Sequence, residues 1–382
     1  RDDVESRGLG DVYKRQVTGC LAERYQKQMD EEFPEIDAVV GIAKNDDIVE
    51  IINSVMLDRR VVTFGDKLCH NMEGDKLQST LPHYAYLRIA DGCSNKCSYC
   101  AIPLIRGKMR SRKMENIIEE AKKFAENGVK ELVIVAQDVT AYGIDLYKKY
   151  ALPELLKQLC KIDGIKWIRL LYCYPERMTD ELIETIKTED KVLNYIDIPI
   201  QHCNKEILRN MYRGGDEQSL RELFAKLRRE IPGVVLRTTL ITGFPGETEE
   251  QFSELAEFVN DIKFERLGCF AYSAEEDTPA AEMPDQVDEG ERQRRADIIT
   301  SEQEIRMGEY YAGMVGNTYE VVCEGFDRYS DMYFGRSMHF APEIDGMIYF
   351  TSAKDKGPLT IGDFVNVKIT DVLENNLLGE RV

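Results

Sequence analysis

The chain has 382 residues, of which 43% are hydrophobic and 31% charged, and its formal net charge is −19. This length predicts two or three domains, and the composition is typical of a globular cytoplasmic protein. Neither a secretory leader nor an apolar run of about eighteen residues is found, so we expect no membrane partner. The acidity disfavours nucleic acids as partners, because an acidic surface repels phosphates.

The first sixteen residues lack an apolar period, and Val17 begins as if in the middle of a strand. Their last part, LGDVYKRQ, resembles a translated sequencing-adaptor remnant. We therefore interpret residues 1–16 as a non-native segment, with a native disordered arm as the alternative. Residues 17–65 alternate between strand and helix patterns and are predicted to end an α/β unit. Residues 66–83 show no periodicity and are predicted to form a linker.

From Tyr84 onward, six apolar segments typical of buried strands alternate with helical patterns. Such repeats predict parallel strands, right-handed crossovers and an α/β fold shaped as a partial (βα)6 barrel, over residues 84–312. Short alternating segments in residues 313–382 predict a small antiparallel β-barrel. The six strand candidates are residues 84–89, 131–136, 167–172, 195–200, 234–241 and 267–272.

A cysteine motif follows directly on the first of these strands. The segment ADGCSNKCSYCAIPLIRG places Cys93, Cys97 and Cys100 at the spacing CxxxCxxC. Three thiolates on one loop suit a [4Fe–4S] cluster and leave one iron open to a substrate or cofactor. Zinc is the alternative metal, but it usually takes a fourth Cys or His nearby, and His83 lies upstream of the strand. We therefore predict an iron–sulfur cluster.

The motif, with the aromatic Tyr99 before its last cysteine, resembles the radical S-adenosylmethionine superfamily. The resemblance implies that the open iron chelates the amino and carboxylate groups of S-adenosylmethionine. The reduced cluster would then split this cofactor into methionine and a 5′-deoxyadenosyl radical. Cys93, Cys97 and Cys100 would accordingly be both metal ligands and catalytic residues, with Tyr99 at the cofactor site.

Polar residues at two other strand ends resemble cofactor contacts of the same superfamily. Gln137 and Asp138 follow the second strand, where the resemblance implies contact with the amino group of the cofactor; a turn or helix cap is the alternative. Gln201 and His202 follow the fourth strand and are placed to reach a ribose hydroxyl. A lone histidine such as His202 is often structural, so that alternative stays open.

The fifth strand carries Arg237 and ends in the loop GFPGET, which holds Gly243 and Glu247. Glycines in a loop are by themselves a weak signal, because they also serve plain turns. At this strand end the loop resembles the adenine-side loop of the superfamily. Arg237, Gly243 and Glu247 are therefore predicted cofactor contacts.

Cys20 lies in VTGCLAERY, which is followed by PEIDAVVG. These segments resemble the end of the N-terminal domain of the methylthiotransferases, which binds a second [4Fe–4S] cluster through three cysteines. Cys20 matches the third of them, and the other two would lie upstream, where residues 1–16 stand. We therefore expect the second cluster to be incomplete in this chain. The C-terminal β-barrel resembles the TRAM domain of these enzymes.

Two substrates compete within the methylthiotransferases: an adenosine of tRNA and, for the RimO type, an aspartate β-carbon of small-subunit ribosomal protein twelve. The segments QDVTAYG, DIPIQH and APEIDG resemble the RimO type. Residues 313–382 hold eleven Asp and Glu against six Lys and Arg, a net charge of −5, which suits a basic protein better than tRNA.

The RimO-type resemblance implies a sulfur donor and an electron donor such as a flavodoxin or ferredoxin. The alternative from another class is a non-enzymatic iron–sulfur or RNA-binding module with a β-barrel tail. Polar residues spread over several strand ends disfavour that alternative.

Overall fold

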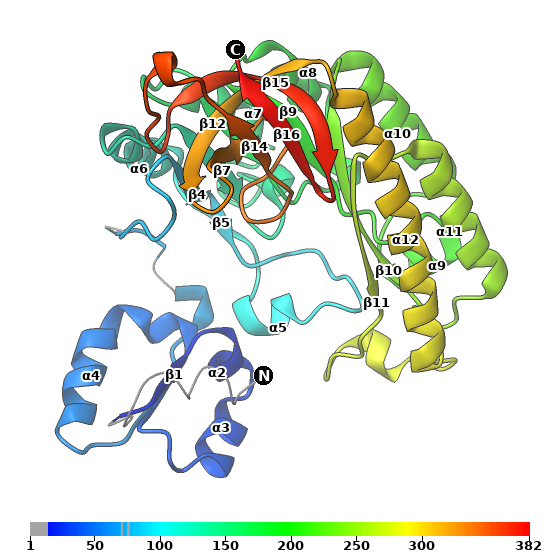
Figure 1. Ribbon diagram of the computed structural model, residues 1–382. Helices are drawn as coiled ribbons and strands as arrows, with labels where there is room; N and C mark the ends of the chain where they lie inside the picture. The colour runs from blue at the N-terminus through cyan, green and yellow to red at the C-terminus, as the bar shows by residue number, and fades with distance from the viewer. Residues whose placement is uncertain (1–13, 70–71, 75–76) are drawn as a thin grey trace. The chain divides into compact units, whose positions relative to one another are not determined.

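The computed structural model describes residues 14–69, 72–74 and 77–382, and the chain divides into two compact units (Figure 1). The first unit contains the residues up to 75 together with 91–96 and 100–110, and the second contains the remainder. Most of the segment interpreted as non-native lies outside the described residues. None of the helices in the described ranges is long and apolar enough to cross a membrane.

A three-stranded parallel sheet forms the centre of the first unit. Its middle strand alternates between two small cores: Val39 packs with Ala22 and Met29, and Val40 packs with Ile51. The helical segment after β1 is interrupted at Tyr25, so it forms two short helices. The elements are β1 (Gln16–Thr18), α2 (Cys20–Arg24), α3 (Gln26–Glu32), β2 (Ala38–Val40), η2 (Ile42–Asp47), α4 (Ile48–Met56), β3 (Val61–Thr63), η3 (Lys67–Cys69) and α5 (Ile102–Arg106).

Six parallel strands form the sheet of the second unit, in the order β11-β10-β9-β8-β7-β4. The two end strands, β4 and β11, do not pair with each other, so the barrel is open. This confirms the predicted partial barrel of six strands. The strands are β4 (Tyr84–Arg88), β7 (Glu131–Val135), β8 (Trp167–Leu170), β9 (Val192–Asp197), β10 (Val235–Thr242) and β11 (Arg266–Ala271).

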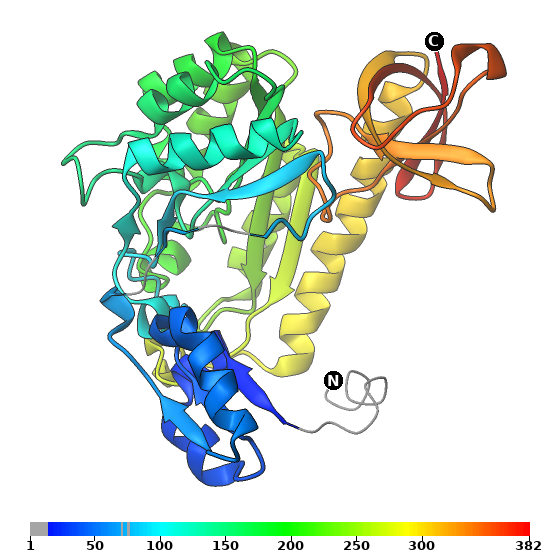
Figure 2. The same ribbon diagram turned by 90° about the vertical axis from the view of Figure 1, so that its left-hand side faces the viewer.

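Amphipathic helices connect these strands and cover one face of the sheet (Figure 2). In the first of them, Ile117, Ala121 and Phe124 recur at helical spacing and are buried. Asp216 and Thr248 begin two of the later helices with capping boxes that satisfy the first free N–H groups. The helices are α6 (Met114–Glu126), α7 (Leu152–Leu159), α8 (Asp180–Thr188), α9 (Lys205–Asn210), α10 (Glu217–Glu230) and α11 (Glu249–Ile262).

A closed β-barrel follows the long helix α12 (Glu289–Met314), which contributes Tyr311 and Met314 to the core of this barrel. Its strand order is β12-β13-β14-β16-β15, and β14 pairs with β16 in parallel. The expected small β-barrel is confirmed, with four antiparallel strand pairs and one parallel pair, because five strands cannot close a ring without one parallel pair. The strands are β12 (Thr318–Asp327), β13 (Met332–Arg336), β14 (Ile348–Thr351), β15 (Phe364–Leu373) and β16 (Asn376–Arg381).

A buried ionic network joins the open sheet to the closed barrel within the second unit. Glu131, the first residue of β7, binds Arg169 and Arg336 at 2.7 Å each. Arg336 also binds Glu324 at 2.8 Å, and His83 Nε2 lies 3.0 Å from the same carboxylate. The partner of His83 is thus Glu324. His83 precedes the N-terminal end of β4, whereas the cysteine motif follows the C-terminal end of that strand.

Candidate functional site

The three cysteines of the motif lie on the loop between β5 (Ala90–Asp91) and α5, and each is partly exposed. Gly92 opens the loop with a φ of +74°, and a Cβ there would lie 2.5 Å from the carbonyl oxygen of Lys108. The Cys93 N–H donates to the carbonyl of Gly107 at 3.1 Å. The loop therefore returns on itself just after its last cysteine.

The donor set fits an iron–sulfur cluster, because soft thiolates are the ligands that such clusters take. In the described ranges, no three Cys, His, Asp or Glu side chains converge on a position for one metal ion. A cubane does not require such convergence, since each thiolate binds a different iron.

Residues 97–99 of the loop are held by the second unit. Ser98 is buried; its N–H donates to the carbonyl of Met211 at 3.1 Å and its hydroxyl donates to that of Asn210 at 2.7 Å. Tyr99 packs against a cluster that includes Phe244, from the loop after β10. Two of the segments predicted from sequence, the cysteine motif and the GFPGET loop, thus lie together.

The residues after β7 divide into two roles. The Asp138 carboxylate accepts hydrogen bonds from Thr140 Oγ1 at 2.5 Å and from the Ala141 N–H at 3.2 Å, and it forms an ion pair with Arg177. Asp138 therefore caps the short helix η4 (Val139–Ala141), the alternative that the sequence left open. Gln137 Oε1 is buried without a hydrogen-bond partner among the described residues, so an acceptor is available there.

Gln201 and His202 follow β9 at the same edge of the sheet. Gln201 has a φ of +70°, and its backbone pairs with β10 through Thr239 and Ile241 at 2.9 Å each. His202 is fully buried, and its Nδ1 accepts from the Asn204 N–H at 3.0 Å. In the neutral ring the proton is therefore on Nε2, which lies 3.6 Å from the Glu247 carboxylate.

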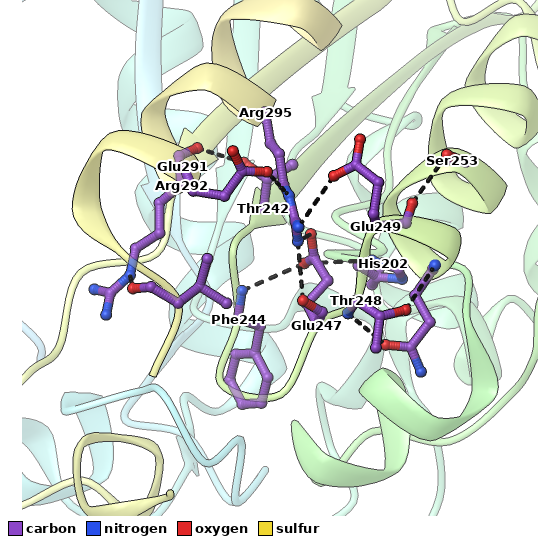
Figure 3. Close-up of polar contacts among 12 residues, drawn as sticks. His202, Thr242, Phe244, Glu247, Thr248, Glu249, Ser253, Glu291, Arg292 and Arg295 are labelled. Atoms are coloured by element: carbon purple, nitrogen blue, oxygen red, sulfur yellow. Dashed lines mark hydrogen bonds and ion pairs between the residues drawn. The ribbon is translucent and has the colours of Figure 1, made fainter. Parts of the chain in front are cut away.

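Glu247 is the centre of a buried network between the loop after β10 and α12 (Figure 3). Its carboxylate binds Arg295 at 2.8 Å and accepts from the Phe244 N–H at 3.3 Å. Burial would raise the pKa of Glu247, but His202, the loop backbone and Arg295 outweigh burial and lower it. A side chain at Gly243, whose φ is +68°, would overlap Arg292. Glu247 and Gly243 thus fix the shape of this loop.

Arg237 is the third residue of β10, five residues before the end of that strand. Its guanidinium lies 3.5 Å from Asp197, the last residue of β9, and these two residues are in register. Arg237 therefore lies farther from the C-terminal ends of the strands than the other predicted cofactor contacts do. The assignments of Gln201, His202, Arg237, Gly243 and Glu247 as cofactor contacts stay predictions.

Arg213 was not anticipated from the sequence. It is buried, its Nη2 donates to the carbonyl of Pro199 at 2.8 Å, and its guanidinium lies 4.2 Å from the ring centre of Tyr174. Its Nη1 is 4.0 Å from Cys97 Sγ, and among the described residues no carboxylate lies within ion-pairing distance of it, while the charge of Glu176 acts on it from farther away. A buried cation without a direct ion pair marks a place for an anionic group.

Cys20 is exposed at the start of α2, within the first unit. Arg106 Nη2, at the end of α5, donates to Cys20 Sγ at 3.3 Å, and its Nη1 donates to the Asp91 carboxylate at 2.9 Å. Asp91 precedes Cys93 by two residues. Arg106 therefore contacts both Cys20, the predicted ligand of the second cluster, and Asp91, which precedes the main cluster loop.

Comparison with known proteins agrees with this geometry. Residues 87–259 match the family model of the radical SAM superfamily, and residues 315–382 match that of the TRAM domain. The ribosomal protein uS12 methylthiotransferase RimO of Caldanaerobacter subterraneus subsp. tengcongensis is 48% identical over 362 residues, which cover 94% of this chain and 82% of that protein. The enzyme of the same name from Clostridium botulinum strain Hall is 48% identical over 365 residues, covering 95% of this chain and 81% of that one.

Among solved structures, the radical S-adenosylmethionine methyltransferase TsrM from Kitasatospora setae superposes with a TM-score of 0.54. The two chains are 14% identical, and the match covers 70% of this chain and 57% of TsrM. At this identity the likeness concerns the fold alone.

Proposed function

Because the chain belongs to the RimO family of radical S-adenosylmethionine methylthiotransferases, we propose that it adds a methylthio group to the β-carbon of an aspartate of ribosomal protein uS12. One observation carries this proposal: three partly exposed cysteines at CxxxCxxC follow the first strand of an open six-stranded barrel, in a chain 48% identical to RimO over nearly its whole length. The β-carbon hydrogen is too weakly acidic for an ordinary base, so this substitution requires radical chemistry.

Cys93, Cys97 and Cys100 would hold the [4Fe–4S] cluster, which supplies the electron that cleaves S-adenosylmethionine. The unpartnered Gln137 Oε1 suits the ammonium group of this cofactor, and the buried Arg213 suits its carboxylate. Gln201, at the end of β9, would contact the ribose. Tyr99 and the loop shaped by Gly243 and Glu247 would form the adenine side, with His202 orienting Glu247.

Replacing hydrogen by a methylthio group needs a sulfur donor and an electron donor, for which a flavodoxin or ferredoxin is suited. We infer that Cys20 is a ligand of the second cluster, which serves the sulfur transfer. The contacts of Arg106 support this role, because Arg106 donates hydrogen bonds both to Cys20 and to Asp91, which precedes Cys93 by two residues.

The acidic charge of the chain supports a basic protein partner over tRNA. The net charge is −19 overall and −5 over residues 313–382, so the C-terminal barrel would repel a phosphate backbone. Ribosomal proteins that bind RNA are basic, so the acidic chain would attract them rather than repel them.

The test incubates the full-length gene product, reconstituted anaerobically, with purified uS12 and separately with tRNA. We expect a methylthio adduct on one aspartate-containing peptide of uS12 by mass spectrometry, and none on tRNA nucleosides. The Cys97→Ala variant serves as the control and should give neither adduct nor 5′-deoxyadenosine. A methylthiolated adenosine with unmodified uS12 would assign the enzyme to tRNA instead.

A further inference from the structure

A cavity of about 340 Å³ lies between β10, β11, α12 and two turns of the C-terminal barrel, all within the second unit. The residues that matter for its chemistry are Arg237, Arg266, Gly268, Gln303, Glu304 and Asp345. Figure 1 shows α12 running beside β10 and β11. Arg237 pairs in register with Arg266 across the two strands, so both residues belong to the same face of the sheet.

Gly268 lines this cavity although the fold does not require a glycine there. It is absent from the positions with positive φ, and a Cβ would meet only the ring of Phe270, at 3.7 Å. A glycine inside a strand lowers stability relative to a larger residue and often marks close approach of another backbone or a ligand. The space in front of Gly268 is therefore open to a group from outside the chain.

The charges around the cavity indicate what kind of group it takes. Arg237 is balanced by Asp197 at 3.5 Å and Arg266 by Asp345 at 3.7 Å. Two acceptors are left over. Gln303 is only 5% exposed, and its Oε1 has no hydrogen-bond partner within the described ranges, while Glu304 on the next residue is exposed and forms no ion pair there. Arg266 Nε also lacks a hydrogen-bond partner, but Asp345 balances its charge, so the two remaining acceptors suit a cationic side chain with N–H groups.

The strand beside the cavity has a free edge. β11 is the end strand of the six-stranded sheet and, within the described residues, pairs with β10 alone, so its other edge has no strand partner, although α12 packs against β11. An edge without a strand partner can accept an extended peptide. Phe270, two residues after Gly268 on the same face, is 62% exposed. The exposed Asp277 follows in the next loop and adds negative charge near this strand.

We propose that an extended segment of the basic protein substrate lies along β11 and places a lysine or arginine side chain in this cavity. Gly268 leaves room for the segment, and Gln303 and Glu304 receive the cationic group. The inference rests on the proposed function, because it takes the polypeptide substrate from it. It adds a site for substrate recognition that is separate from the cysteine loop.

The experiment measures binding of fluorescently labelled uS12 to the purified chain by anisotropy at several salt concentrations. Gly268→Val should weaken binding about tenfold, because the new side chain occupies the path of the segment. Glu304→Gln should weaken it about fivefold and reduce its salt dependence, because one charge pair is lost. The matched controls are Glu257→Gln, on the exposed face of α11, and Gly308→Ala, whose Cβ would meet nothing within 4 Å.

Thermal unfolding of each variant shows whether it is folded, and Glu304→Gln keeps the test valid if Gly268→Val is not. Unchanged affinity of the folded variants, with the unaltered chain binding uS12, would overturn the inference and leave the proposed function standing. Failure of the unaltered chain both to bind uS12 and, as the full-length product, to modify it would instead reject the proposed function and this inference with it.

Discussion

Arg213 shows how a single buried side chain can identify a site that no motif marks. Its guanidinium is shielded by the Tyr174 ring and lies 4.0 Å from Cys97 Sγ, but no carboxylate in the described residues forms an ion pair with it, and Glu176 acts on it only from a greater distance. Burying a cation in this way is unfavourable unless an anion completes the site. The carboxylate of S-adenosylmethionine is an anion of suitable size and charge.

We predict that Arg213→Met weakens binding of S-adenosylmethionine to the reconstituted protein by roughly 10-fold to 100-fold, as expected for one lost charge-assisted hydrogen bond. Equilibrium dialysis would measure this change, with iron content checked in parallel. The control is Arg209→Met, because that side chain is 75% exposed on α9. Equal cofactor affinity in Arg213→Met and the unaltered protein would contradict the role assigned to Arg213.

At the scale of single residues, the sequence predicts those site residues that lie close together along the chain. Cys93, Cys97 and Cys100 lie within eight residues and could be recognised as one ligand set. Arg213 could not, since its contact with Cys97 spans 116 positions and depends on the fold. Asp138 illustrates the opposite case, because a polar residue after a strand also suits a cap, and capping is what the structure shows.

At the scale of elements, the six parallel strands of the open barrel were predictable from the sequence, whereas the parallel strand pair in the C-terminal barrel was not. Continuous apolar segments indicate buried parallel strands, and all six were found close to their expected bounds. In the C-terminal barrel, β16 is hard to predict from the sequence because NLLGER is short and carries charged residues beside its apolar ones. Without this fifth strand, the parallel pairing of β14 could not be inferred.

The network around Glu131 joins β7 and β8 to β12 and β13, and its stability can be tested through pH. Burial alone would raise the pKa of Glu131, but Arg336 and Arg169 hold it at about 2, against an ordinary value of 4.5. A lowered pKa means that the carboxylate stabilises the fold fully above pH 4.5. That contribution is lost as the pH falls from 4.5 toward 2.

Glu131→Gln should therefore lower the free energy of unfolding at pH 7 by about 3–5 kcal/mol, because two buried guanidinium groups lose their shared counter-ion. Urea denaturation at pH 7, 5 and 3 would show the difference from the unaltered protein shrinking at pH 3. A difference that is constant over this range would mean that the charge of Glu131 is not what stabilises the junction. Glu320→Gln is the control, since Glu320 forms an exposed ion pair on β12.

At the scale of the whole molecule, the C-terminal barrel is tied to the six-stranded sheet by the Arg336–Glu131 ion pair and by the packing of α12 in the barrel core. Removing residues 313–382 would take away Arg336 and expose Glu131 and the apolar side of α12. Such a deletion would test folding rather than substrate binding. Point substitutions at the cavity beside β11 separate these two effects, because they leave the ionic network and the barrel core in place.

The number of clusters per chain is the property that depends on both units together. Before Cys93 the sequence holds two cysteines, Cys20 and Cys69, and only Cys20 matches the methylthiotransferase pattern. One thiolate cannot retain a cubane against solvent and chelators, whereas the main loop supplies three. We therefore predict about four irons per chain for protein made from residues 1–382, corresponding to one [4Fe–4S] cluster.

Iron analysis and electron paramagnetic resonance of the reduced protein would count the clusters. Cys97→Ala should lose nearly all iron, while Cys20→Ala should lose almost none, because the main cluster does not use Cys20. Protein made from residues 1–382 should form 5′-deoxyadenosine slowly and, with one cluster, transfer no methylthio group, so the proposed transfer is tested on protein that carries both clusters. About eight irons per chain, or a methylthiolated product, would show that Cys20 already belongs to a complete second cluster. Adding an N-terminal segment with two further cysteines should raise the iron content to that level and make it sensitive to Cys20→Ala.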